Sequence, residues 1–140
     1  MKKRVLFLCI GNSCRSQMAE AFAKAYGKDI LEPSSAGLAP ASGIAALTKK
    51  VLADRNLSID DHYPKDFAEF DPKNLDLVVN MSGQRLPAKL GVPVVDWTVR
   101  DPIGQKESVF QGVAQEIENK VMRLILDLRL QSSGKSAARI

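Results

Sequence analysis

Apolar segments alternate with helical patterns along most of the chain. Four segments have the length and apolar content of buried strands, and they are predicted at Lys3–Cys9, Ile30–Ala36, Leu75–Met81 and Val92–Trp97. In three other segments apolar residues recur with the period of a helix, which predicts helices at Ser16–Tyr26, Gly43–Arg55 and Glu107–Leu130. The chain therefore reads as strands that alternate with helices.

This alternation, with several of the strands apolar throughout, favours a parallel sheet covered on both faces. We expect an α/β fold, a three-layer sandwich in which a four-stranded parallel sheet carries helices on both faces. Residues 1–130 are expected to form a single domain. Residues 131–140, which are rich in Ser, Ala, Gly and Lys, are predicted to be a flexible tail.

The composition, with 45% hydrophobic and 26% charged residues, is typical of a globular protein. The net charge of +4 arises in the termini, where five basic residues stand without acids, so we expect no nucleic-acid partner. No apolar stretch approaches the length of a membrane span, and the N-terminal apolar run is too short for a signal peptide. We expect a cytoplasmic protein with no membrane partner.

The segment Cys9–Ser16 carries the clearest chemical signal, because it joins the first predicted strand to the first predicted helix through Gly11 and Asn12. Free backbone N–H groups and the helix dipole make such a turn an anion site, and Arg15 adds a planar fork that suits a tetrahedral oxyanion. The same field favours the thiolate of Cys9. The pattern predicts phosphoryl-transfer chemistry, although a cysteine at a strand end can also be an inert packed residue.

Cys9 and Cys14 are the two cysteines of the chain. Their spacing within one loop indicates neither a structural disulfide nor a metal site. If Cys9 is oxidised to a sulfenic acid, Cys14 is placed to capture it as a reversible disulfide. The alternative is that Cys14 only packs beneath the loop.

A leaving alkoxide needs a proton from a general acid on the side opposite the nucleophile. Asp101 follows the last predicted strand, so it is expected at the carboxyl edge of the sheet, where ligands of such folds bind. Pro102 and Gly104 favour a turn that could hold it there, although an Asp-Pro pair can also simply start a turn. His62 is predicted to lie on the surface, and Trp97 is predicted to belong to the core.

These motifs resemble the low-molecular-weight protein tyrosine phosphatases, and more closely the arsenate reductases built on the same fold. The resemblance rests on Val-Leu-Phe-Leu-Cys-Ile-Gly-Asn-Ser-Cys-Arg-Ser-Gln-Met-Ala-Glu at residues 5–20, on Ser34–Gly37, on Asp96–Trp97 and on Asp101-Pro102. It extends over nearly the whole chain except the tail. It implies that a phosphate-binding loop follows the first strand.

The resemblance also implies a role for each residue of the site. Cys9 would attack phosphorus or arsenic, Arg15 would hold the oxyanion, and Asp101 would protonate the leaving group and then activate water. The rest of the oxyanion-binding loop would be formed by Ile10, Gly11, Asn12, Ser13, Cys14 and Ser16. Asn12 would adopt a left-handed turn and Ser16 would donate to the Cys9 thiolate, with Glu20 and Ser35 behind the loop. No metal or cofactor is implied.

Departures from the two branches leave the activity open. Ser82 and Gln84 stand where self-regenerating reductases carry further cysteines, and Ile103 stands where phosphatases carry an aromatic residue. We expect a phosphate monoester hydrolase that acts on phosphotyrosine proteins through a cysteinyl-phosphate intermediate. One alternative is an arsenate reductase that uses the same loop and an external thiol such as glutathione, mycothiol or a redoxin. The other is a non-catalytic binder of phosphate or a phosphoprotein.

Overall fold

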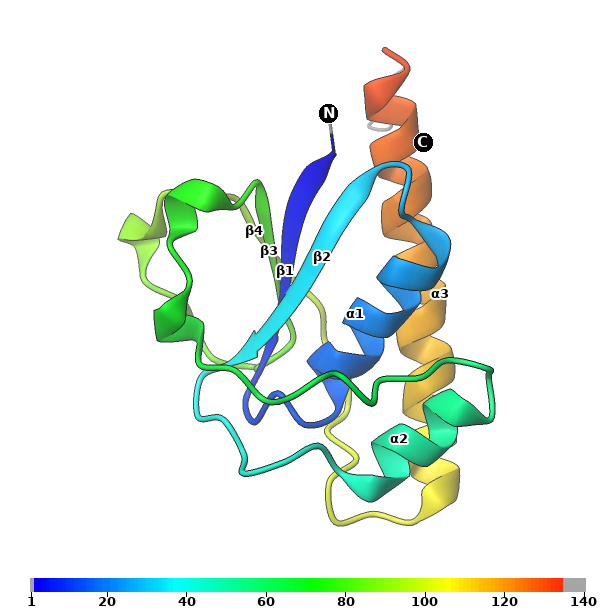
Figure 1. Cartoon of the computed structure of the whole chain (residues 1–140). Helices are drawn as coiled ribbons and strands as arrows, with labels where there is room; N and C mark the ends of the chain where they lie inside the picture. Colours follow the sequence, from blue (N-terminus) through cyan, green and yellow to red (C-terminus); the bar gives the residue numbers. More distant parts are fainter. Residues whose placement is uncertain (1, 135–140) are drawn as a thin grey trace.

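A computed structural model describes residues 2–134 and contains one four-stranded parallel sheet (Figure 1). The sheet has the order β2-β1-β3-β4, and its strands are β1 (Lys3–Cys9), β2 (Leu31–Gly37), β3 (Leu77–Asn80) and β4 (Val94–Asp96). Every neighbouring pair is parallel, as the sequence predicts. The carboxyl ends of all four strands therefore meet at one edge.

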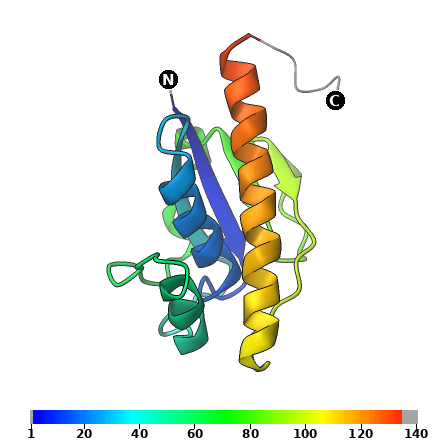
Figure 2. The same cartoon turned by 90° about the vertical axis from the view of Figure 1, so that its right-hand side faces the viewer.

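The sheet is covered on both faces, but by different kinds of helix. Three α-helices cover one face, and they are α1 (Arg15–Tyr26), α2 (Ala46–Ala53) and α3 (Glu107–Ser132). Figure 2 shows α1 and α3 side by side along this face. The other face carries three 3-10 helices, η1 (Phe67–Glu69), η2 (Pro72–Asn74) and η3 (Ala88–Leu90). The three-layer α/β fold is confirmed, and its second outer layer consists of these short helices.

Side chains of β1 alternate between the two layers. Val5, Phe7 and Cys9 belong to the larger core cluster under the α-helices, whereas Leu6 and Leu8 belong to the smaller cluster under the 3-10 helices. The strand is apolar throughout because both of its faces are buried. No helix within residues 2–134 is long and apolar enough to cross a membrane.

Of the predicted elements only the first strand keeps its boundaries, and the strand predicted over 75–81 is shortened to β3 at Leu77–Asn80. The helix predicted over 43–55 is shorter, since α2 ends at Ala53 and Asn56 adopts a left-handed conformation with φ of 63°. β4 is an edge strand of three residues, paired with the end of β3. α3 continues to Ser132, so the prediction of a flexible tail is wrong for residues 131 and 132. Residues 135–140 of the predicted tail lie outside the described residues.

Candidate active site

The loop Cys9–Ser16 lies at the carboxyl edge of the sheet, between β1 and α1. Four of its carbonyl oxygens accept hydrogen bonds from backbone N–H groups of residues 38–45, the segment after β2. The pairs are Leu38 to Cys9 (3.1 Å), Ala39 to Ile10 (2.8 Å), Ala41 to Gly11 (2.9 Å) and Ala45 to Ser13 (3.2 Å). None of these bonds uses an N–H group of the loop. The carbonyl oxygens are thus occupied while the amide donors remain available to an anion.

Two backbone features allow the loop to take this shape. Asn12 has a positive φ of 51°, the left-handed conformation that asparagine tolerates. Gly37, at the end of β2, lies directly against the loop, and a Cβ atom there would stand 2.5 Å from the carbonyl oxygen of Ile10. The loop can approach β2 this closely only because residue 37 has no side chain.

The Cys9 thiol is almost fully buried and has one close polar neighbour, Ser16 Oγ, at 2.9 Å. Ser16 Oγ in turn accepts a hydrogen bond from Asn12 Nδ2 (2.7 Å). Because this amide supplies a donor to the hydroxyl oxygen, the hydroxyl hydrogen is free to point at the Cys9 sulfur. The structure thus brings Cys9, Asn12 and Ser16 together in one hydrogen-bonded group.

Cys14 is buried in the same loop as a free thiol. Burial raises the pKa of the Cys14 thiol to about 12, and a hydrogen bond with Thr48 offsets this only in part. The nearby Cys9 sulfur also contributes to the increase. Cys14 is therefore protonated near neutral pH.

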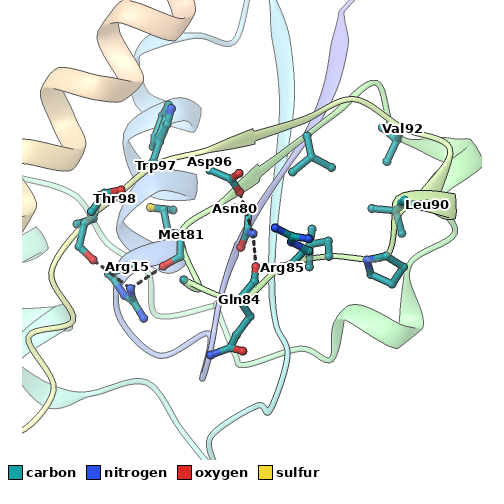
Figure 3. A pocket seen from close by; sticks show the side chains of 16 residues that line it. Arg15, Asn80, Met81, Gln84, Arg85, Leu90, Val92, Asp96, Trp97 and Thr98 are labelled. Atoms are coloured by element: carbon teal, nitrogen blue, oxygen red, sulfur yellow. Dashed lines mark hydrogen bonds between the residues drawn. The ribbon is translucent and has the colours of Figure 1, made fainter.

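Arg15 joins the loop to two other segments at the carboxyl edge. Its Nη1 donates to the carbonyl oxygens of Met81 (2.6 Å) and Val99 (3.1 Å), as Figure 3 shows for the first of these. Its Nη2 lies 3.6 Å from Asp101 Oδ2, an ion-pair distance. Within residues 2–134 neither Nε nor Nη2 of Arg15 donates a hydrogen bond to protein, which leaves two donors for a bidentate oxyanion.

Asp101 lies where a general acid is expected, and it is half exposed. Its Oδ1 accepts a hydrogen bond from the backbone N–H of Ile103 (3.1 Å), so the Asp-Pro turn holds the carboxylate over the Arg15 side chain. Ile103 is 47% exposed next to it. Trp97 packs against the core, and its ring is tilted by 46° to that of Phe7, with the ring centroids 6.0 Å apart.

Behind the loop lies a polar network that sequence reasoning largely missed. Ser35 Oγ donates to Glu20 Oε1 (2.5 Å), and Lys24 Nζ lies 2.8 Å from Glu20 Oε2. The Lys24 ammonium also contacts His62 Nε2 (3.2 Å). Glu20 and Ser35, both predicted behind the loop, therefore contact each other, and Glu20 is linked towards the loop through His62.

The sequence predicted His62 on the surface, and this prediction is wrong. Only 6% of the His62 side chain is exposed. Burial lowers the pKa of His62 although Glu20 opposes this, so the imidazole is neutral near pH 7. Its Nδ1 lies 2.8 Å from Gln17 Oε1. Gln17 Nε2 then donates to the backbone and side-chain oxygens of Asn12, each at 3.1 Å. His62 and Gln17 thus hold the left-handed turn from behind.

An open cavity of about 640 Å³ adjoins Arg15 on the side of β3 and β4. Its wall is formed by the segment after β3, including Gln84, Arg85 and Leu86, and by Trp97 (Figure 3). Within residues 2–134 no group of three or more His, Cys, Asp or Glu side chains is arranged to hold a metal ion.

The fold and the site define a cysteine-based oxyanion enzyme on a parallel α/β sheet. Residues 4–135 match the family model described as low molecular weight phosphotyrosine protein phosphatase, and the chain belongs to this family. The chain is similar to "Arsenate reductase 1" of Bacillus cereus, with 38% identity, over 87% of this chain and 93% of the relative. It is also similar to "Glutaredoxin arsenate reductase" of Synechocystis sp., with 32% identity over 88% and 96%.

A solved structure described as "An arsenate reductase in the phosphate binding state" has the same fold. It superposes with a TM-score of 0.84 and 30% sequence identity, and the match covers 90% of this chain and 98% of that one. The superfamily named from the sequence, with its arsenate reductase branch, is therefore confirmed.

Proposed function

We propose that this protein reduces arsenate with electrons from an external thiol. The observation that carries the proposal is the site itself, a buried Cys9 next to Ser16 and Arg15, in a chain 38% identical to a relative named arsenate reductase. This reverses the order of preference drawn from the sequence, in which phosphate ester hydrolysis came first. We keep hydrolysis as the second candidate.

The proposed reaction begins when the Cys9 thiolate attacks arsenic and one arsenate oxygen leaves as water after protonation. A thiolate of the reductant then attacks the Cys9 sulfur and forms a sulfur–sulfur bond. The electron pair of the sulfur–arsenic bond remains on arsenic, which falls from As(V) to As(III) and leaves as arsenite. A second thiol reduces the mixed disulfide and regenerates Cys9, so two thiols are oxidised for each arsenate reduced.

Two residues support an external reductant. Ser82 occupies the position after β3 where a resolving cysteine would stand, and its hydroxyl is held by Asn80 Oδ1 (2.6 Å). Cys14, with a pKa of about 12, has little thiolate near neutral pH and is a slow nucleophile. A glutathione, mycothiol or redoxin thiol would therefore resolve the arsenic adduct. Because such thiols stay reduced in the cytoplasm, we place the reaction there.

The second candidate, hydrolysis of phosphate monoesters such as phosphotyrosine proteins, is favoured by one observation. The half-exposed carboxylate of Asp101 lies 3.6 Å from Arg15, where it can protonate a leaving alkoxide and then activate water. A binder without catalysis would need neither this acid nor a thiol next to Ser16. In either reaction we propose that Cys14 protects an oxidised Cys9 by forming a disulfide.

The first experiment measures two rates on the same preparation. Arsenite formation is followed with glutathione–glutaredoxin, thioredoxin and mycothiol systems, and hydrolysis is followed with p-nitrophenyl phosphate, each against Cys9→Ser. Arsenite formation with one thiol system, lost in Cys9→Ser and retained in Cys14→Ser, is the expected result. Rapid hydrolysis without arsenite in any system would establish the second candidate instead. Full cellular function of Cys9→Ser would indicate a binder.

A further inference from the structure

Asn80, the last residue of β3, is buried and uses all of its side-chain hydrogen-bonding capacity. Its Oδ1 accepts from the backbone N–H (3.0 Å) and the hydroxyl (2.6 Å) of Ser82. Its Nδ2 donates to the carbonyl oxygen of Gln84 (2.8 Å) and to Asp96 Oδ1 (3.0 Å), as Figure 3 shows. A side chain with this many partners at a strand end fixes the course of the chain that follows.

The orientation of the Asn80 amide is determined by these partners. If the amide were turned over, its NH₂ group would face the Ser82 N–H and its oxygen would face the Asp96 carboxylate. Both contacts would be repulsive, so only the observed orientation satisfies all groups. The turn over residues 80–84 is closed further by the Gln84 N–H, which donates to Ser82 Oγ (3.0 Å).

The geometric consequence concerns Met81, which lies between Asn80 and Ser82. The Met81 carbonyl and the Ser82 N–H belong to the same planar trans peptide, so they point in opposite directions. When Asn80 Oδ1 holds the Ser82 N–H, the Met81 carbonyl must point the other way. There it accepts the 2.6 Å hydrogen bond from Arg15 Nη1.

We infer that Asn80 is a positioning residue for Arg15, which acts by setting the orientation of the 81–82 peptide. The inference rests on the proposed role of Cys9–Ser16 as the oxyanion site. With Nη1 held by Met81 and Val99, the guanidinium keeps Nε and Nη2 for the oxyanion. Without Asn80 the peptide is free to rotate, and the longer bond to Val99 (3.1 Å) alone restrains Nη1.

A matched pair of variants tests this role. Asn80→Val and Asn80→Thr have nearly the same shape and both suit a strand end, but only threonine can accept the Ser82 N–H, two residues along the chain. Ser82→Ala keeps that N–H and removes only the hydroxyl. Asn119→Ala, on the exposed face of α3, serves as a surface control. Circular dichroism and urea unfolding establish that each variant folds.

The experiment measures how strongly the positive charge next to Cys9 favours an anionic reagent. It does not require turnover. Cys9 is alkylated with the anion iodoacetate and with neutral iodoacetamide, and the rate ratio reports the position of the guanidinium. The dissociation constant of inorganic phosphate is measured in parallel. We expect Asn80→Val to lose most of the preference for iodoacetate and to weaken phosphate binding roughly 10- to 100-fold. Asn80→Thr should retain part of both, and Ser82→Ala nearly all.

The Arg15→Ala background separates positioning from general damage. Asn80→Val should change neither readout further in that background, because the group through which Asn80 acts is gone. A folded Asn80→Val with wild-type ratio and affinity would overturn the inference, as would equal losses in the valine and threonine variants. If Arg15→Ala itself left the wild-type ratio unchanged, the proposed oxyanion site would fail instead.

Discussion

The two loops that meet at Arg15 are built in opposite ways. In Cys9–Ser16, the side chains of Asn12 and Ser16 are fully buried and hydrogen-bonded to each other. In the loop Trp97–Gly104, which we call the acid loop, Asp101 and Ile103 are about half exposed and bond mainly to each other. The first loop is preorganised for charge stabilisation, whereas the exposed side chains of Asp101 and Ile103 in the acid loop have few contacts that would oppose their movement.

This difference fits the two tasks of the site. The tetrahedral oxyanion has the same shape in every candidate substrate, so a rigid loop can bind all of them in one geometry. In the hydrolysis that is the second candidate function, leaving groups would vary, and an acid on an exposed loop would adjust to them. Arg15 connects the two loops through its bonds to Val99 and Asp101. Changes in the buried loop should therefore affect folding and thiol chemistry, and changes in the acid loop should affect only turnover.

The largest expected effect is loss of all activity on mild oxidation, through a Cys9–Cys14 disulfide within the buried loop. Dithiothreitol should restore activity in the wild type but not after prolonged peroxide treatment of Cys14→Ser. Because the pKa of Cys14 is about 12, its thiolate fraction grows with pH, and the disulfide should form faster at pH 9 than at pH 7. Peptide mass spectrometry showing sulfinic acid on wild-type Cys9 would contradict a protective role for Cys14.

Asp101→Asn should give the next largest effect, confined to turnover. We expect the hydrolysis rate of alkyl phosphates to fall by roughly 10²- to 10⁴-fold, with a smaller loss for p-nitrophenyl phosphate, whose leaving group needs no proton. Phosphate affinity and urea unfolding should stay close to wild type, since the carboxylate is half exposed. Equal losses for both substrates would argue against general acid catalysis.

Gln17→Leu, which changes the support of the buried loop, should lower stability, whereas Asp101→Asn lowers turnover. The leucine preserves volume but leaves the Asn12 carbonyl oxygen and His62 Nδ1 without their partner, while Asn12 Oδ1 keeps the Lys65 N–H. We expect the free energy of unfolding to fall by about 1–3 kcal/mol. Gln115→Ala, at an exposed position of α3, should change it by less than about 0.5 kcal/mol. If urea unfolding gave the same value for both variants, the network behind the loop would not be stabilising.

The smallest expected effect is a pH dependence of stability due to His62. Burial lowers its pKa from 6.5, so below pH 6.5 the unfolded chain binds a proton that the folded chain does not. Stability should therefore fall as the pH is lowered from 7.5 to 5.5, and should fall less in His62→Gln. Urea unfolding at both pH values measures this. An equally steep fall in the variant would assign the dependence to other groups.

Local patterns in the sequence predicted the site better than they predicted its support. Cys9 and Arg15 were chosen as candidates because a strand, a turn and a helix start are local signals, and Asp101 because parallel strands bring their carboxyl ends together and because the family resemblance extends to its Asp-Pro pair. His62 was placed on the surface because it lies in a predicted loop and because Asp101 already supplied the acid of the expected mechanism. Its partners Gln17 and Lys24 are 45 and 38 residues away, and no periodicity reports such contacts.

The second outer layer was predicted only in outline for a similar reason. The segment over 67–92 has no helical period, and its turns begin at the capping side chains Asp66 and Asp71. Caps of this kind start short 3-10 helices as readily as longer ones. Asn80 likewise reads as one polar residue at the end of an apolar strand, and its four bonds become visible only in the folded chain.

The bonds that hold Arg15 end on main-chain oxygens, those of Met81 and Val99. Every amino acid carries such an oxygen, so mutational drift at these two positions leaves the acceptors in place as long as the backbone keeps its course. A survey of tolerated substitutions would therefore show exchange among apolar side chains at the buried residues 81 and 99, and stricter limits at Asn80. In this part of the molecule the contacts to the arginine ask only for a backbone, whereas the neighbouring residue must keep its amide.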